Sequence, residues 1–499
     1  MESVNGQIIK KIKDLKKDAI RYAPALIIPA LLSLLTIGIF TRIFNPDQYG
    51  QYVLVVAVAA IITNALSVYS QSSILRFYPK FKNENDGFKF LQHFAIMIFI
   101  TILFLCVLAA ALFPFKEKIF GEFAKFYFAA FLMIVFGIIF ENLTAFFRAK
   151  LEPQKYSKYR VGFSGLYTLL AISFIFIVLK DVVSIIFAFS VSYLVISLFM
   201  SRELGLWQLR GLLRDIDFNY IRKFAVYGFP LVGWMVGFTI LNLSDRFLIE
   251  LFRSTQEVGI YAAAYDLIGK GFGLISSPVM LAAHPLIINM WESGQRENVG
   301  KVIINFSRYF LLAGLPVVML ISLFSSQLIR IVLGAQFQES YVVVPFIAAS
   351  FFLWGLGMFM HKGLELAEKT RPIFFSIFVC IILNILLNII FIPKFGYIAA
   401  AATTLVSFMF YPILIYRLTP PAMRWAMPWR SLGSGLSSCL ASAGILVILK
   451  KYFFCGETGL FLIGFLMMLG LVIYAVVLYF LGEYKNYELA YVKKSLRLK

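Results

Sequence analysis

Two charged residues stand inside a long apolar stretch of the sequence and could bind an ion or a charged ligand. Asp266 and Lys270 lie four residues apart between residues 258 and 285, with the acid first. In a helix this order favours an ion pair on one face, and a charge deep in an apolar segment is costly enough to indicate function. Lys270 is the first candidate for contact with an anionic group, and Asp266 is the partner that keeps it charged. A purely structural ion pair is the alternative interpretation.

Other polar or cationic residues lie within these apolar stretches or at their ends. The further candidates for a substrate-binding cavity are Arg42, Arg76, Arg148, Arg246, Asn64, Glu141 and Asn384. Glu141 and Arg148 share one helical face. Plainer explanations exist, because an arginine near a helix end reaches the membrane interface and an asparagine often hydrogen-bonds a neighbouring helix. His361 and Glu365, at the end of a later stretch, are expected at the inner interface.

The composition of the chain indicates which secondary structure holds these residues. Hydrophobic residues make up 61% of the chain and charged residues 14%, with a mean hydropathy of +0.84. These values are far from those of soluble domains. The apolar runs suit helices that cross roughly 30 Å of hydrocarbon, and they are too long and too continuous for barrel strands.

We therefore predict an all-α integral membrane protein with fourteen transmembrane helices. Their predicted ranges are 23–43, 51–75, 90–113, 124–147, 161–179, 182–201, 224–250, 258–285, 302–324, 341–366, 372–392, 396–417, 431–449 and 458–481.

The distribution of Lys and Arg predicts the orientation of the chain. With the N-terminus inside, the tails and alternate loops hold about three times as many basic residues as the opposite loops. We expect a multi-pass protein of the plasma membrane with both termini in the cytoplasm. The net charge of +20 is scattered through the loops, which argues against a nucleic-acid partner. The first apolar stretch holds Pro24 and Pro29 and is too long for a cleaved signal.

The two halves of the chain carry matching turns. Gly50 and Tyr52 correspond to Gly259 and Tyr261, an offset of 209 residues, and two further matches follow in order at nearly the same spacing. This pattern predicts a six-helix duplication with both copies in the same orientation. The predicted organisation is a basic N-terminal segment 1–22, an N-lobe 23–201, a linker 202–223, a C-lobe 224–417, a loop 418–430, a helix pair 431–481 and a basic tail 482–499.

Two segments of the chain are similar to a known family: the turn FNPDQYGQY at 44–52 and the passage LSDRFLIELFRSTQEVGIYAAAY at 243–265. Together with the fourteen-helix pattern, they resemble the polysaccharide transporter family, the flippases of O-antigen and exopolysaccharide synthesis. That family belongs to the multidrug/oligosaccharidyl-lipid/polysaccharide exporter superfamily. The resemblance implies two lobes in a V around a central cavity. It also implies alternating-access transport of a polyprenyl-diphosphate-linked oligosaccharide, and a final helix pair like the one that holds the lipid tail in lipid II flippases.

Rival functions remain open at this stage. An ion-coupled drug exporter or a lipid II flippase would share the superfamily, and a membrane scaffold for a glycan assembly complex is the non-transport alternative. An enzyme is disfavoured because the sequence shows neither a catalytic constellation nor a nucleotide-binding glycine loop. We expect no metal site and no cofactor, with H⁺ or Na⁺ as an open coupling ion. Membrane lipids and glycan polymerase machinery are the expected further partners of a monomer. The identity of the glycan does not follow from the sequence.

Overall fold

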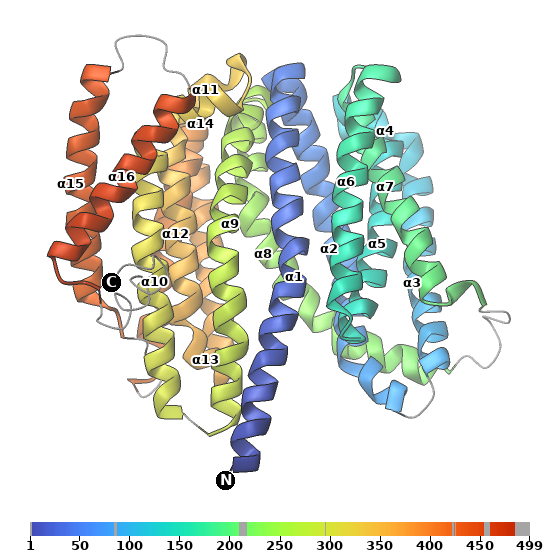
Figure 1. Cartoon of the computed structure of the whole chain (residues 1–499). Coiled ribbons are helices and arrows are strands. Elements are labelled where there is room, and N and C mark those ends of the chain that lie inside the picture. Colours follow the sequence, from blue (N-terminus) through green and yellow to red (C-terminus); the bar gives the residue numbers. More distant parts are fainter. Residues whose placement is uncertain are drawn as a thin grey trace. The chain divides into compact units, whose positions relative to one another are not determined.

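The computed structural model describes residues 2–83, 87–208, 217–294, 296–421, 424, 426–453 and 460–484 (Figure 1). Within these ranges every element is a helix, which confirms the all-α prediction. Residues 209–216 of the predicted linker and 485–499 of the basic tail lie outside the described part.

The described chain divides by its packing into two compact units, Met1–Ala263 with Ile381–Ala400, and Ala264–Cys380 with Ala401–Lys499. We call them unit 1 and unit 2. These bounds differ from the predicted lobes because α8 packs along α2 and so joins unit 1. The lobes at 23–201 and 224–417 stay predictions.

Long helices form most of unit 1. They are α1 (Glu2–Ile43), α2 (Pro46–Asn83), α3 (Gly87–Leu112), α5 (Tyr127–Ala149), α6 (Pro153–Ile177), α7 (Val182–Glu203), α8 (Phe218–Phe252) and the start of α9 (Thr255–Glu292). The passage from α3 to α5 is itself helical, with η1 (Phe113–Phe115), α4 (Lys116–Phe120) and η2 (Gly121–Phe126), and η3 (Leu206–Gln208) follows α7.

Unit 2 contains the rest of α9 and the helices that follow it, except for the part of α14 that belongs to unit 1. They are α10 (Arg296–Leu323), α11 (Ser325–Val332), η4 (Ala335–Val343), α12 (Val344–Met360), α13 (Lys362–Leu366), α14 (Arg371–Leu418), α15 (Trp429–Phe453) and α16 (Leu460–Phe480). Two sequence-based expectations are corrected here. The predicted outer loop 325–340 is largely helical, and the predicted span 341–366 is interrupted at His361.

Local chemistry explains several helix boundaries. The side-chain oxygen of Asn45 accepts a hydrogen bond from the Gln48 backbone N–H at 2.8 Å, just before α2, and Asp181 does the same for Val183 before α7. Such caps satisfy backbone N–H groups that a helix start leaves unpaired. Within α14, Gly396 has a φ of 60° and breaks the helix, between the spans predicted at 372–392 and 396–417.

Ten segments of the described chain are long and apolar enough to cross a membrane. One of them, Phe90–Ala149, contains both α3 and α5, and another, Arg371–Leu418, contains the break at Gly396. These segments support a multi-pass membrane protein, whereas the number of fourteen spans remains a prediction.

The matching turns of the two halves pack directly on each other within unit 1. A Cβ atom at Gly50 would lie 2.0 Å from the Thr255 carbonyl oxygen, and one at Gly259 would lie 1.9 Å from the Pro46 carbonyl oxygen. Each pair relates the same two positions under the offset of 209 residues. Only glycine permits such a close backbone approach, so the turn sequences hold glycine where α2 and α9 begin.

In unit 2, α15 and α16 pack against each other and α15 packs along α10 (Figure 1). One polar junction secures this pair. The Arg308 guanidinium donates from Nε to Glu483 Oε1 at 2.8 Å, both side chains are buried, and Ser431 donates to the same carboxylate. A buried ion pair is stable only when hydrogen bonds satisfy its polar atoms. The contact between Arg308 and Glu483 therefore holds the final helix pair against α10.

Candidate functional site

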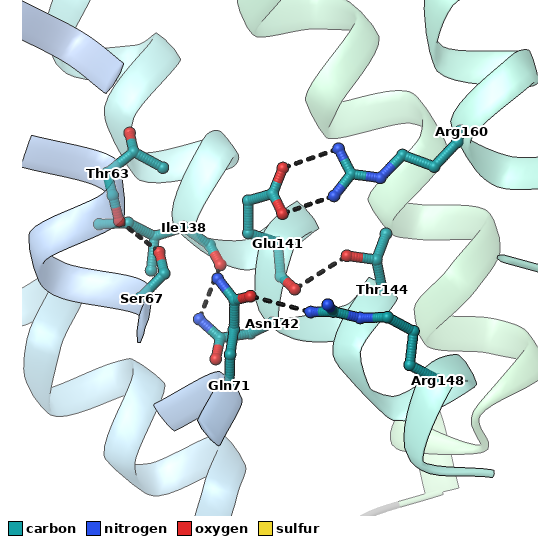
Figure 2. A network of polar contacts seen from close by, with 9 residues as sticks. All are labelled: Thr63, Ser67, Gln71, Ile138, Glu141, Asn142, Thr144, Arg148 and Arg160. Atoms are coloured by element: carbon teal, nitrogen blue, oxygen red, sulfur yellow. Dashed lines mark hydrogen bonds and ion pairs between the residues drawn. The ribbon is translucent and has the colours of Figure 1, made fainter. Parts of the chain in front are cut away.

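A network of charged side chains lies between α2, α5 and α6 of unit 1 (Figure 2). Glu141 on α5 faces Arg160 on α6, and the guanidinium donates two parallel hydrogen bonds to the carboxylate, Nη1–Oε1 at 2.9 Å and Nη2–Oε2 at 2.7 Å. This two-point geometry is the strong form of an arginine–carboxylate pair. The pair is three-quarters buried, with 25% of the Arg160 side chain and 20% of the Glu141 side chain exposed.

Arg148 lies two turns beyond Glu141 on the same face of α5, as predicted. Its Nη2 donates to Gln71 Oε1 on α2 at 3.0 Å (Figure 2). The guanidinium groups of Arg148 and Arg160 both lie near the ring of Tyr156, at 6.0 and 5.6 Å from its centroid. The aromatic face stabilises both cations. We call Gln71, Glu141, Arg148, Tyr156 and Arg160 the arginine cluster.

The arginine cluster has unused capacity to bind an anion. It holds two guanidinium cations and one carboxylate, so its formal charge is +1. The Nε atoms of Arg148 and Arg160 are buried and have no hydrogen-bond partner in the described part of the chain. A buried donor without an acceptor is costly, and a ligand with several acceptor oxygens would satisfy both. Phosphate groups offer such oxygens, and the planar guanidinium group matches their geometry.

Sequence reasoning missed Arg160, which lies just before the predicted span 161–179 and was therefore assigned to a loop. In the structure α6 begins at Pro153, so Arg160 is seven residues inside the helix. The proline was the available signal, because proline is favoured in the first turn of a helix.

The remaining polar stripe of α2 makes contacts between and within helices. Asn64 Nδ2 lies 3.5 Å from Thr239 Oγ1 on α8, and Ser70 donates to Asn142 Oδ1 on α5 at 2.5 Å. Ser67 donates to a carbonyl of its own helix (Figure 2). These contacts match the alternative explanation of helix-to-helix hydrogen bonding.

Asn384 belongs to a second buried network of unit 1, around Asp245. Asn388 Nδ2 donates to Asp245 Oδ1 at 2.7 Å and to Asn384 Oδ1 at 3.1 Å. Tyr261 O–H donates to the other oxygen of Asp245 at 2.7 Å. Asp245 is only 2% exposed, so these donors replace the water that a carboxylate needs. The sequence placed Asp245 and Asn384 on separate spans and did not bring them together.

The other predicted residues differ in how far their side chains are exposed. Lys270 is exposed and Asp266 is half-buried. The predicted pairing of the two stays a prediction. Arg42 and Arg76 are exposed, as expected for cations near an interface, whereas Arg246 is buried.

An apolar cavity of about 400 Å³ lies elsewhere in unit 1, among α2, α3, η2 and α5. Its lining is hydrophobic except near Glu250, and none of the predicted polar candidates contributes to it. Such a lining suits a hydrocarbon chain, whereas an ionic group would lose its hydration there without compensation. The arginine cluster, in contrast, carries the chemistry for an anionic head group.

These features define a multi-pass helical membrane protein with charged sites inside its helical core. Residues 15–291, more than half of the chain, match the family described as "Polysaccharide biosynthesis protein". The chain belongs to this family, and the predicted resemblance is confirmed.

Curated relatives agree with this assignment. The chain is 23% identical over 242 residues to the probable low-salt glycan biosynthesis flippase Agl15 of Haloferax volcanii, covering 48% of this chain and 51% of the relative. It is 26% identical over 239 residues to the probable flippase AglR of the same organism, covering 46% and 48%. The match thus spans about half the length of these relatives.

Solved structures share the fold. The lipid II flippase MurJ in an inward closed conformation aligns with a TM-score of 0.76 at 14% identity, covering 92% of this chain and 98% of that one. A multidrug resistance MATE family transporter in an inward-facing conformation aligns with a TM-score of 0.60 at 15% identity, covering 84% and 98%. At such identities the likeness concerns the fold alone.

Proposed function

We propose that this protein is a flippase that moves polyprenyl-diphosphate-linked oligosaccharide units across the plasma membrane for polysaccharide synthesis. The observation that carries the proposal is the arginine cluster: two half-buried arginines whose buried Nε–H groups have no hydrogen-bond partner in the described part of the chain, inside a membrane protein of the polysaccharide biosynthesis family. A diphosphate head group cannot cross hydrocarbon unaided because its charge would lose its hydration. The cluster offers it replacement donors.

The geometry suggests how loading and release occur. Arg160 lies seven residues after the start of α6, about 10 Å along the helix axis, and is held by Glu141 when no substrate is bound. A diphosphate would compete with Glu141 for the same N–H groups and would also reach Nε of both arginines. Binding of the diphosphate would therefore replace the contact between Arg160 on α6 and Glu141 on α5. A ligand that changes such a contact can favour one arrangement of the two helices over another.

Lys270 is proposed as a further phosphate contact. Its side chain is exposed in unit 2, so its ammonium can meet an anion, with Asp266 one turn before it on the same helix. Transport follows alternating access in this proposal, with both termini in the cytoplasm, a monomeric protein and loading from the cytoplasmic side. Delivery to glycan polymerase machinery would follow, and H⁺, Na⁺ or the membrane potential supplies the driving force.

Deletion of the gene in its native host tests the function, with analysis of lipid-linked intermediates in each leaflet. Accumulation of unpolymerised lipid-linked oligosaccharide on the inner leaflet is expected. Restoration by the wild-type chain and failure of an Arg160→Gln chain expressed at the same level would connect the phenotype to the arginine cluster. Unchanged surface glycan with hypersensitivity to drugs would contradict the proposal and favour drug export.

Lipid II transport is the second candidate, favoured by the alignment with the MurJ structure over 98% of that chain. Both substrates carry a polyprenyl diphosphate, so the arginine cluster suits either of them. The same lipid analysis separates the two, because accumulation of the peptidoglycan precursor would identify this second function. Surface glycan loss with intact lipid-linked intermediates would instead indicate a scaffold.

A further inference from the structure

A second cluster of titratable side chains lies in unit 2, where α12 ends and α13 begins. Lys362 donates from Nζ to Glu365 Oε2 at 2.7 Å, one turn along α13. The same ammonium lies 2.8 Å from Nδ1 of His284 on α9. Lys362 is only 4% exposed, so its charge depends on these two contacts rather than on water.

The cluster continues into the interior of unit 2. His361 Nδ1 lies 2.6 Å from the hydroxyl of Tyr411 on α14, and its Nε2 lies 3.8 Å from Glu365 Oε2. Tyr411 is 1% exposed. We call His284, His361, Lys362, Glu365 and Tyr411 the lysine–histidine cluster. It extends from half-exposed His284 and Glu365, through buried Lys362 and His361, to the buried tyrosine.

The protonation states follow from donor and acceptor capacity. An ammonium can only donate, so the Nδ1 atom of His284 must accept from Lys362, and the proton of the neutral ring is assigned to Nε2. The charged groups that face His284 are Lys362 and Glu365, and the same two groups face His361. With both histidines neutral, the cluster therefore carries one positive and one negative charge.

A proton from water that binds Nδ1 of His284 would change this arrangement. The imidazolium loses its acceptor atom, so the hydrogen bond from Lys362 is lost and two cations face each other. Glu365 Oε1, which is 3.8 Å from the same Nδ1, is the carboxylate oxygen placed to receive the new N–H. One proton thus raises the formal charge of the cluster from zero to +1 and weakens the hold on Lys362.

We propose that the lysine–histidine cluster is the proton-binding site that couples a proton gradient to transport. Protonation of His284 turns a neutral ion pair into a cationic site and releases the Lys362 ammonium toward an anion. Histidine suits this role because one proton changes both its charge and the hydrogen-bonding role of its Nδ1 atom. By linkage, an anionic head group that binds the cationic form also favours uptake of the proton. The link to transport rests on the proposed function, whereas proton binding does not.

The proton site can be tested without any substrate. Hydrogen–deuterium exchange at the C2 atom of each histidine, followed by mass spectrometry against pH on the purified full-length protein, reports the titration of His284. Lys362→Met removes the opposing cation, so the midpoint of the His284 profile should move to higher pH by about one unit. Lys369→Met, at an exposed lysine beyond α13, is the matched control and should leave it in place. A His284 profile that Lys362→Met does not move would overturn the site.

The coupling is tested with farnesyl diphosphate as a short polyprenyl diphosphate probe. Binding to the wild-type protein in nanodiscs should strengthen between pH 8 and pH 6, by at most about tenfold per pH unit for one linked proton. His284→Gln should retain only the pH dependence of the probe's own phosphate ionisation. Equal pH dependence in both proteins would overturn the coupling. If the probe fails to bind at any pH while the His284 profile responds to Lys362→Met, the proposed function fails and the proton site stands.

Discussion

The arginine cluster of unit 1 and the lysine–histidine cluster of unit 2 both hold a cation against a carboxylate inside a membrane protein, but they use different chemistry. Arg160 and Glu141 form a two-point pair whose guanidinium keeps its charge at any physiological pH. Lys362 instead shares its ammonium between a carboxylate and a neutral histidine. The first arrangement provides a fixed positive charge, and the second a charge that one proton can change.

This difference assigns separate tasks to the two clusters. A fixed cation with unused donors suits recognition of a phosphate at every pH, because neither guanidinium titrates. A site that switches its charge suits energy coupling, because it can be emptied and filled by a proton gradient. Substitutions at the two clusters and at Lys270 test this division.

The largest effect is expected for Arg160→Ala. It leaves the Glu141 carboxylate buried without its partner, which should lower the free energy of unfolding by about 3 kcal/mol and abolish transport. Thermal unfolding of the purified protein and recovery of surface glycan in a deletion host measure the two consequences.

Arg160→Lys separates charge from geometry at the same position. It keeps the cation but loses the two-point fork, so the fold should survive while transport falls about tenfold, as one lost charge-assisted hydrogen bond predicts. Full transport by Arg160→Lys would contradict a phosphate-binding role for the fork.

Lys270→Ala should cost more than nine-tenths of transport while the protein level stays near normal, because the exposed side chain contributes little to packing. Lys270→Arg should retain part of the transport, since the charge remains with altered geometry. Lys369→Ala is the control at another exposed lysine of unit 2. Normal transport by Lys270→Ala would remove this residue from the site and leave the arginine cluster as the cationic contact.

The two clusters also show what the sequence could and could not predict. The all-α membrane fold, the break near Gly396 and the shared face of Glu141 and Arg148 follow from composition, length and helical periodicity. The pairing of Arg160 with Glu141 does not, because periodicity defines the face of one helix and leaves open which neighbouring helix faces it.

The second limit on prediction from the sequence concerned residues at the ends of helices. His361 and Glu365 were expected at the inner interface and Lys362 was not among the candidates, because the break after Met360 was not foreseen. That break turns the three residues toward His284 and Tyr411. For Lys270 and Asp266, the spacing favours an ion pair on one face of a helix, and that pairing stays a prediction.

A prediction of intermediate size concerns Tyr411→Phe. This change removes the hydroxyl that hydrogen-bonds His361 and leaves the ring, which packs 5.2 Å from Trp354. The loss of one buried hydrogen bond should cost about 1 kcal/mol of stability and should alter the pH dependence of transport. Tyr156→Phe, at the arginine cluster, keeps the ring that faces both guanidinium groups and should alter neither.

The smallest expected effect is that of Tyr156→Leu. Removal of the ring takes away the aromatic face that lies near both Arg148 and Arg160, a contribution of about 0.5–1 kcal/mol for each cation at a partly exposed site. Affinity for farnesyl diphosphate should fall a few-fold at pH 6 and at pH 8 alike, because the arginine charges do not titrate. A loss seen at only one of the two pH values would show that the arginine cluster takes part in proton coupling, and the division between a fixed and a switchable charge would then be wrong.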